Sequence, residues 1–261
     1  MIDIHNNKYN RIKEEIDRVI KLGSENVEVK KGEILKANNS YINFIKNITK
    51  SDVYSINETI DECSNWLSLD LDIQKSFELL SEHNNHGIDT CEIRVHSYTF
   101  YLIVRLLKPD YIIETGVANG KSSLIMLEAL SRNNNGHLIS IDMAMKSEDG
   151  KDKYKAEGMD IGWLVPSRLH DRWDLRIGKS DEILPQLTDL DNTVDIFFHD
   201  SLSNYENMTY EYGQATRLLT DGGLLISDDI TACSAFEEFV DLYCHTINCF
   251  GTLGTAFINP K

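Results

Sequence analysis

Positive charge is scarce in this chain. The 261 residues include 26 Lys and Arg against 42 Asp and Glu, so the formal net charge is −16. Duplex nucleic acid and anionic membranes both attract basic surfaces, so this balance argues against either as a partner. No run in the sequence approaches the roughly 18 consecutive apolar residues that a membrane-spanning helix needs. We therefore expect neither a nucleic-acid partner nor a membrane partner.

The sequence also lacks the marks of secretion and of a disulfide framework. Its first residues, Met1 to His5, turn polar at once and show no basic-then-apolar leader pattern. The five cysteines are widely spaced, odd in number and contain no C-x-x-C pair. Such a set is typical of free thiols in a reducing compartment. These absences favour a cytoplasmic protein that acts on a small molecule.

The chain changes character near residue 90. Before it, apolar residues recur at helical spacing around residues 12–22, 41–48 and 60–80, without a glycine-rich motif or a metal-ligand pattern. Residues 1–90 are therefore expected to form a helical N-terminal extension. It would pack on the main domain or on a partner subunit, as in a homo-oligomer, or part of it would form a lid over a substrate pocket.

After residue 90, short apolar runs alternate with helical stretches, which indicates a mostly parallel α/β sheet. Residues 91–261 are expected to form this domain. The last two strands, joined through Gly251 and Gly254, predict a hairpin that adds one antiparallel strand near the C-terminus. Residues 143–172 show no clear periodicity and are interpreted as a long loop with a helix inside it. The expected strands are 111–113, 138–141, 175–177, 194–198, 224–226, 247–250 and 255–258.

Ligands of open α/β sheets bind beyond the carboxyl ends of the strands, so these ends hold the candidate residues. The first strand leads into the run ETGVANGKSS, which starts at Glu114. Its glycines, Gly116 and Gly120, permit a tight turn and a close approach to a ligand, and the next helix opens with free N–H groups. The run does not match G-x-G-x-x-G, the pattern that binds the pyrophosphate of a nicotinamide dinucleotide. A nicotinamide cofactor is therefore disfavoured, and a nucleoside ligand without pyrophosphate is left.

Acidic residues follow several of the other strands. Asp142 ends the second strand, where it could take both hydroxyls of a ribose or serve as a helix cap. Asp200 follows the fourth strand, and Asp228 and Asp229 follow the fifth. Three neighbouring carboxylates would repel one another and raise each other's pKa values. A hard divalent cation such as Mg²⁺ would relieve that repulsion, so the pattern predicts a metal site.

Jointly these motifs resemble the class I S-adenosylmethionine-dependent methyltransferases. Within that class the chain looks like the cation-dependent O-methyltransferases, both the catechol type and the macrocin- and novobiocin-type sugar enzymes, and the bacterial group that includes cephalosporin-hydroxylase-like proteins. The segments that carry the resemblance are 114–122, 178–187, 199–206 and 222–229, and the whole similarity covers about residues 93–258. The resemblance implies a Rossmann-like class I methyltransferase sheet.

It also implies a role for each matched residue. The residues that would bind S-adenosylmethionine are Glu114, Gly116, Ala118, Gly120, Ser122, Asp142, Ser180, Asp181 and Asp200. Among them, Ser122 would bind the methionine carboxylate, Asp142 the ribose, and Ser180 with Asp181 the adenine. Mg²⁺ or another divalent cation would be held by Asp200, Asp228 and Asp229. The catalytic candidates are Asp200 and His199.

The chain departs from the family pattern where a general base is expected. Catechol-type enzymes carry a Lys three residues after the aspartate matched by Asp200, and many bacterial relatives carry a His there, but this chain has Ser203. The sugar-type enzymes place an acidic base one position earlier, where this chain has Leu202. By residue type alone, the other candidates for the base are His199, His170 and His96.

The leading hypothesis is a Mg²⁺-dependent O-methyltransferase that methylates a hydroxyl of a small molecule, such as a sugar or a natural-product intermediate. Two alternatives stay open because a fold does not determine a function. The scaffold could catalyse a hydroxylase-like or cyclising reaction, which the missing base motivates. It could also be a catalytically silent cofactor-binding subunit with the N-terminal helices as its interface.

Overall fold

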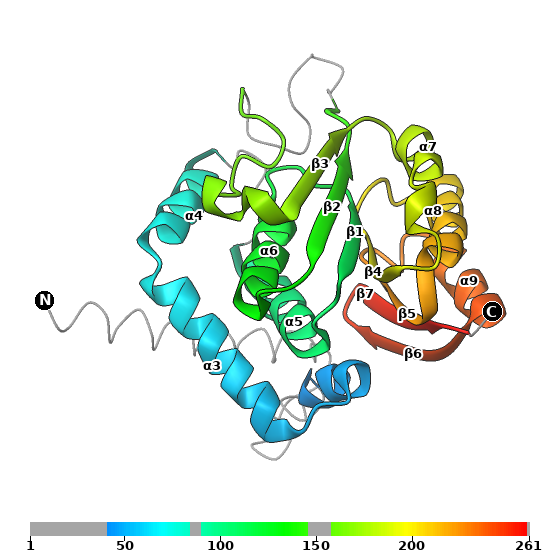
Figure 1. Cartoon of the computed structure of the whole chain (residues 1–261), viewed down its shortest axis with the longest axis horizontal. Helices are drawn as coiled ribbons and strands as arrows, with labels where there is room; N and C mark the ends of the chain where they lie inside the picture. Colours follow the sequence, from blue (N-terminus) through cyan, green and yellow to red (C-terminus); the bar gives the residue numbers. More distant parts are fainter. Residues whose placement is uncertain (1–40, 84–89, 146–157, 260–261) are drawn as a thin grey trace, which may run out of the picture. The chain divides into compact units, whose positions relative to one another are not determined.

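The computed structural model describes residues 41–83, 90–145 and 158–259 (Figure 1). The chain divides into two compact units, Met1–Leu106 and Leu107–Lys261. The helix expected around residues 12–22 lies outside the described residues. No helix in the described part is long and apolar enough to cross a membrane.

The first unit is helical throughout its described part. It contains a helix over residues 41–49, then α3 (Val53–Leu69), α4 (Leu71–His83) and α5 (Thr90–Leu107). Asp52 begins α3 by accepting a hydrogen bond from the Ser55 backbone N–H at 2.9 Å. Trp66 of α3 stacks on Tyr101 of α5 with ring centroids 5.6 Å apart. Helix α5 lies in this unit up to Leu106.

The second unit is built on a seven-stranded sheet, and the predicted fold class is confirmed. The strand order is β3-β2-β1-β4-β5-β7-β6. Strands β1 to β5 pair in parallel, and β7 is antiparallel to both β5 and β6, as the predicted hairpin requires (Figure 1). The strands are β1 (Tyr111–Thr115), β2 (His137–Asp142), β3 (Trp173–Ile177), β4 (Val194–His199), β5 (Leu219–Ser227), β6 (Cys244–Phe250) and β7 (Leu253–Ile258).

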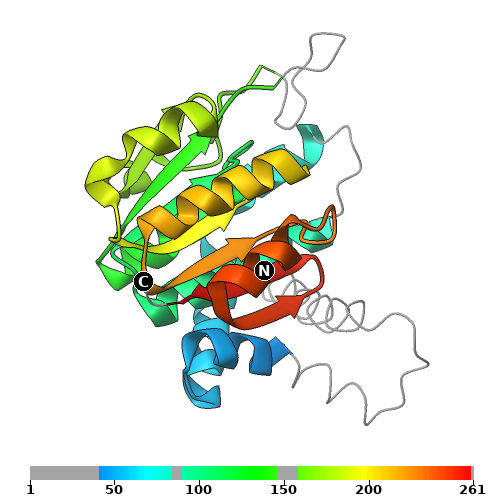
Figure 2. The same cartoon turned by 90° about the vertical axis from the view of Figure 1, so that its right-hand side faces the viewer.

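Helices cover both faces of the sheet. Helix α6 (Lys121–Asn133) lies on one face, and α8 (Tyr205–Leu218) and α9 (Ala235–Tyr243) lie side by side on the other (Figure 2). The α8 face contains a core of alternate strand residues, for example Ile113, Phe197 and Leu225. Between β3 and β4 the chain forms α7 (Ser180–Ile183), η2 (Leu184–Gln186) and η3 (Thr188–Leu190). In the stretch expected to be a loop, the described part contains η1 (Ser167–Arg172).

Candidate active site

The strand order reverses between β1 and β4, and this switch point is where ligands of open α/β sheets bind. The Asp200 backbone N–H donates to the Thr115 carbonyl at 2.8 Å, so the ends of the two strands are in direct contact. Gly116 has φ +89°, and a Cβ at this position would lie 1.9 Å from the Asp200 carbonyl oxygen. Only glycine fits here, because both the backbone conformation and the space exclude a side chain.

Asp142 supports the glycine turn that follows β1. Its Oδ2 atom accepts hydrogen bonds from the Val117 and Ala118 backbone N–H groups, each at 2.6 Å. Ala118 itself has φ +48°, an unusual conformation for a residue with a side chain. The side chain of Asp142 therefore acts within the turn rather than at the start of a helix. Asp142 and the turn meet at one edge of the sheet, as their predicted positions at the ends of neighbouring strands indicated.

A second segment packs on the turn, and no pattern in the sequence predicted this contact. The Gly162 and Leu164 backbone N–H groups donate to the carbonyls of Ala118 and Asn119, at 2.9 and 3.0 Å. The Trp163 indole Nε1 donates to Asn119 Oδ1 at 2.7 Å. We call residues 161–165 the covering segment. Because it is held mainly by backbone hydrogen bonds, it has no side-chain periodicity for a sequence pattern to detect.

Glu114 is a fully buried carboxylate on the α6 face of β1. It accepts hydrogen bonds from the hydroxyl groups of Ser122, of Ser123 at 2.6 Å and of Ser140 at 2.6 Å. Burial raises the pKa of Glu114 to about 7, although the three serine hydrogen bonds act in the opposite direction. Glu114 therefore connects β1, β2 and the first turn of α6.

The raised pKa of Glu114 makes the stability of the fold depend on pH. Because the folded-state pKa of about 7 exceeds the ordinary value of 4.5, the folded protein binds the proton more tightly than the unfolded chain. The stabilisation is complete below pH 4.5 and is lost as pH rises through 7. Relative to Glu114→Gln, the free energy of unfolding of the wild type should fall by about 3 kcal/mol over that range. Urea denaturation of both proteins across this pH range measures the difference; parallel pH profiles would contradict it.

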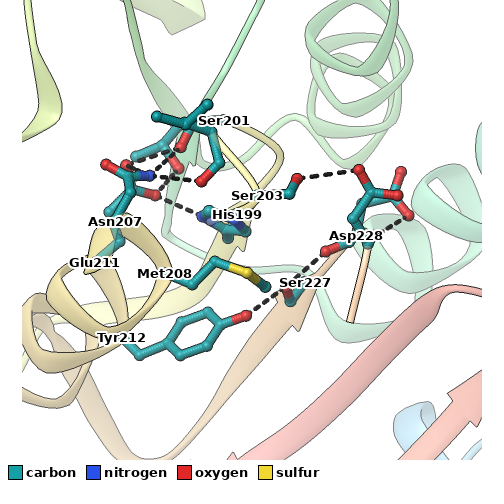
Figure 3. Close-up of polar contacts among 12 residues, drawn as sticks. His199, Ser201, Ser203, Asn207, Met208, Glu211, Tyr212, Ser227 and Asp228 are labelled. Atoms are coloured by element: carbon teal, nitrogen blue, oxygen red, sulfur yellow. Dashed lines mark hydrogen bonds and ion pairs between the residues drawn. The ribbon is translucent and has the colours of Figure 1, made fainter. Parts of the chain in front are cut away.

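The opposite face of the sheet contains a second buried carboxylate, Glu211 of α8. His199 is fully buried too, and its Nδ1 atom lies 2.6 Å from Glu211 Oε2. Figure 3 shows His199, Ser201 and Asn207 converging on Glu211. A general base must touch the hydroxyl that it deprotonates, so this buried position favours a supporting role for His199 over direct contact with a substrate.

The three predicted metal ligands lie at the ends of β4 and β5. The pKa of Asp200 lies well above its usual value, because surrounding protein atoms desolvate the carboxyl and because Asp228 adds negative charge beside it. Part of Asp200 nevertheless remains exposed to solvent. Asp228 Oδ1 accepts a hydrogen bond from Thr252 Oγ1 at 3.0 Å, and Asp229 Oδ2 accepts one from Ser203 Oγ at 3.0 Å. Within the described ranges, no three His, Cys, Asp or Glu side chains form a ready cluster for one ion.

The remaining candidates lie at the start of α7, on η1 or outside the described side chains, and Ser180 forms a side-chain hydrogen bond with Glu211 of α8. Ser180 and Asp181 open helix α7, whose N-cap residue is Lys179, so neither caps that helix with its side chain. His170 is exposed, and its Nε2 atom lies 3.2 Å from the Val165 carbonyl. The side chain of His96 is not among those described. The roles proposed for these residues stay predictions.

Comparison with known proteins finds similarity to methyltransferases, both in sequence and in fold. Residues 113–230 match the family model of a methyltransferase domain. A comparison with curated proteins finds no match. Among solved structures, an O-methyltransferase from Bacillus cereus in complex with SAH is similar, with a TM-score of 0.52 and 15% identity over 78% of this chain and 100% of that one.

Two further structures share the fold. A putative O-methyltransferase from Klebsiella pneumoniae has a TM-score of 0.51 and 18% identity over 73% of this chain and 90% of that one. Cofactor-bound Rv0187 from MTB has a TM-score of 0.54 and 12% identity over 77% of this chain and 97% of that one. At these identities the likeness defines the fold alone.

The sheet order, the glycine turn at the switch point and the acidic strand ends define a class I methyltransferase fold. Residues 113–230 match the model of a methyltransferase domain family, in agreement with the resemblance to the S-adenosylmethionine-dependent methyltransferases.

Proposed function

We propose that this protein is an S-adenosylmethionine-dependent O-methyltransferase that methylates a hydroxyl group of a small molecule, such as a sugar or a natural-product intermediate. The observation that carries the proposal is the glycine turn at the switch point, supported by Asp142 and in contact with the end of β4 at Asp200. The O-methyltransferase from Bacillus cereus, which has the same fold, is described in complex with SAH.

The cofactor would lie along the carboxyl ends of β1 to β3. In this arrangement Gly116 and Ala118 line the methionine portion, and Gly120 lets the chain turn into α6 with its free N–H groups. Asp142 takes the ribose hydroxyls while one of its oxygens holds the turn. Ser122 binds the methionine carboxylate. The residues beside the adenine are Ser180 and Asp181.

The reaction is an in-line transfer in which the enzyme mainly positions the reactants. S-adenosylmethionine would supply the methyl group, with the O–CH₃ bond forming as the S–CH₃ bond breaks, and the hydroxyl proton would pass to the Asp200 carboxylate and on to solvent. The products are a methyl ether and S-adenosylhomocysteine. Asp200, at the switch point, is the proposed catalytic carboxylate. Ser203 stands where relatives carry a base, and its hydroxyl is bound to Asp229.

We also propose a divalent cation, Mg²⁺ by preference. Carboxylate oxygens are the donors that Mg²⁺ prefers, and the mutual repulsion of Asp200, Asp228 and Asp229 is what a cation would relieve. When bound, Mg²⁺ would acidify and orient the substrate hydroxyl.

Transfer of labelled methyl groups tests the proposed reaction. The protein is incubated with S-adenosylmethionine labelled in the methyl group and a panel of sugar and phenolic hydroxyl compounds. Products that gain one methyl group on oxygen are expected. A product without an added methyl group would indicate a hydroxylase-like or cyclising reaction. Cofactor binding without turnover on any compound would indicate a silent subunit.

Metal removal should abolish this turnover. We expect activity to be lost after exhaustive EDTA treatment and restored by Mg²⁺, because the cation carries the charge that activates the hydroxyl. Asp228→Ala should lower Mg²⁺-dependent turnover by about 100-fold or more, whereas the exposed Asp221→Ala serves as a control. Unchanged turnover in EDTA would remove the metal from the mechanism and leave a metal-free methyltransferase.

Three other assignments complete the proposal. The N-terminal helices are proposed to form a lid or a homo-oligomer surface. The partner of the protein is proposed to be its small-molecule substrate alone, without nucleic acid or membrane. The proposed location is the cytoplasm.

A further inference from the structure

The buried face of helix α8 is apolar except at one position. Its buried residues include Met208, Tyr212, Ala215 and Leu218, which pack on the sheet, and in their midst lies Glu211. A carboxylate in an apolar layer is costly to bury unless every oxygen is well paired. The presence of Glu211 on this face therefore needs an explanation beyond packing.

Glu211 is paired with groups from several segments of the chain, and one of them is Ser180 at the start of α7. Its Oε2 atom accepts from Thr115 Oγ1 at 2.5 Å and faces His199 Nδ1 at 2.6 Å. Its Oε1 atom accepts from Ser201 Oγ at 2.8 Å and from Asn207 Nδ2 at 3.2 Å. Thr115 ends β1, His199 ends β4, and Ser201 lies in the loop that follows β4. One carboxylate thus connects both strands of the switch point and the loop beside it.

These segments carry the candidate residues of the active site. Gly116 directly follows Thr115, and Asp200 directly follows His199. The backbone carbonyl of His199 also accepts a hydrogen bond from the Asp228 N–H at 2.9 Å. Any shift of Thr115 or His199 would therefore move the glycine turn and the acidic strand ends with it.

Stability alone does not explain the pair of His199 and Glu211. An ionised carboxylate only accepts hydrogen bonds, so the Nδ1–H group of His199 donates a hydrogen bond to Glu211. The other ring nitrogen, Nε2, is buried and has no hydrogen-bond partner. An apolar pair of similar volume would avoid this cost and is often at least as stable. The polar pair is therefore better explained by the geometry that it imposes.

We propose that Glu211 is a positioning residue of the transferase site, which holds the ends of β1 and β4 and the loop after β4 in the arrangement that receives the cofactor. This inference rests on the proposed function. It assigns His199 to the same task, as the link between Glu211 and the backbone of Asp200 and Asp228.

The test compares Glu211→Gln with Glu206→Gln, an exposed glutamate in the first turn of the same helix. The side-chain amide of glutamine has one accepting oxygen where the carboxylate has two. The variant therefore loses the hydrogen bonds of one carboxylate oxygen, either those with Thr115 and His199 or those with Ser201 and Asn207. Calorimetric titration with S-adenosylhomocysteine should show about tenfold weaker binding by Glu211→Gln and wild-type binding by the control. The unfolding midpoints of both variants are measured alongside.

Each outcome decides the proposal. Wild-type affinity in a less stable Glu211→Gln would show a purely structural role and overturn it. If that variant does not fold, Ser201→Ala takes its place, which removes one hydrogen bond to Glu211. Several-fold weaker binding by Ser201→Ala supports the proposal, and wild-type binding overturns it.

A second measurement separates this inference from the proposed function. If the wild type itself does not bind S-adenosylhomocysteine, the proposed function fails. The backbone amide signals of Gly116 and Asp228 in NMR spectra then test the positioning role by themselves. They should move in Glu211→Gln and stay in place in Glu206→Gln; equal shifts in the two variants would overturn the inference.

Discussion

Replacing Gly116 by alanine is expected to abolish cofactor binding and to lower the free energy of unfolding by about 3 kcal/mol. The new Cβ would lie 1.9 Å from the Asp200 carbonyl oxygen and 2.5 Å from its carbon, which are backbone atoms that cannot rotate away. The φ angle of +89° adds strain for any residue with a side chain. The two strand ends at the switch point would have to separate. Calorimetric titration with S-adenosylhomocysteine and urea denaturation measure the two effects.

The control for this variant is Gly213→Ala. Gly213 is exposed on α8, and a Cβ there would meet nothing within 4 Å. Alanine in a helix is favoured over glycine by about 1 kcal/mol, so this variant should gain stability and keep its affinity. Equal behaviour of the two variants would show that the contact between Gly116 and Asp200 does not matter for the site.

Replacing Asp142 by alanine is expected to weaken S-adenosylhomocysteine binding by about 100-fold or more, since hydrogen bonds to a charged group contribute about 1.5–3 kcal/mol each. The variant loses the proposed ribose contacts and also the support of the turn, because Asp142 binds the N–H groups of Val117 and Ala118. The measurement is the dissociation constant from calorimetry at a temperature where the variant is folded.

Two further variants separate the roles of Asp142. Asp142→Asn keeps an oxygen that can accept from the turn, so its affinity should lie between those of the wild type and the alanine variant. Asp174→Ala removes an exposed carboxylate on the neighbouring strand β3 and should bind like the wild type. Wild-type affinity in Asp142→Ala would contradict the proposed ribose contact.

The sheet and the glycine turn could be predicted because their signals are local. Short apolar runs bounded by polar turns mark the strands, and the run from Glu114 to Ser123 contains both glycines within one segment. The same reasoning placed Asp142 and Asp200 at strand ends, where a parallel sheet brings them to one edge. The prediction of a hairpin at the C-terminus rested on Gly251 and Gly254 and is confirmed.

The partners of the buried carboxylates could not be predicted. Glu211 and Thr115 are 96 positions apart, and only the packing of α8 on the sheet brings them together. One signal was present: Glu211 occurs on the helical stripe of Met208, Tyr212 and Ala215, where an apolar residue is expected. A charged residue on such a stripe indicates a buried polar contact.

The covering segment was missed for a different reason. Gly162 and Leu164 are held by backbone hydrogen bonds to the turn, and such bonds leave no trace in the order of side chains. The indole of Trp173 lies against Gly162, where a Cβ would come within 2.3 Å of the ring. A lone glycine in a stretch without periodicity does not reveal this contact.

Binding of the cofactor by the unmodified protein tests the central claim most directly. Calorimetric titration of the wild-type chain with S-adenosylmethionine and S-adenosylhomocysteine should show one molecule of either bound per chain, because the described residues form one sheet with one glycine turn at its switch point. Addition of NAD⁺ should give no heat, since the turn lacks the spacing that binds pyrophosphate. No binding of S-adenosylmethionine or S-adenosylhomocysteine, with the protein folded, would contradict the account.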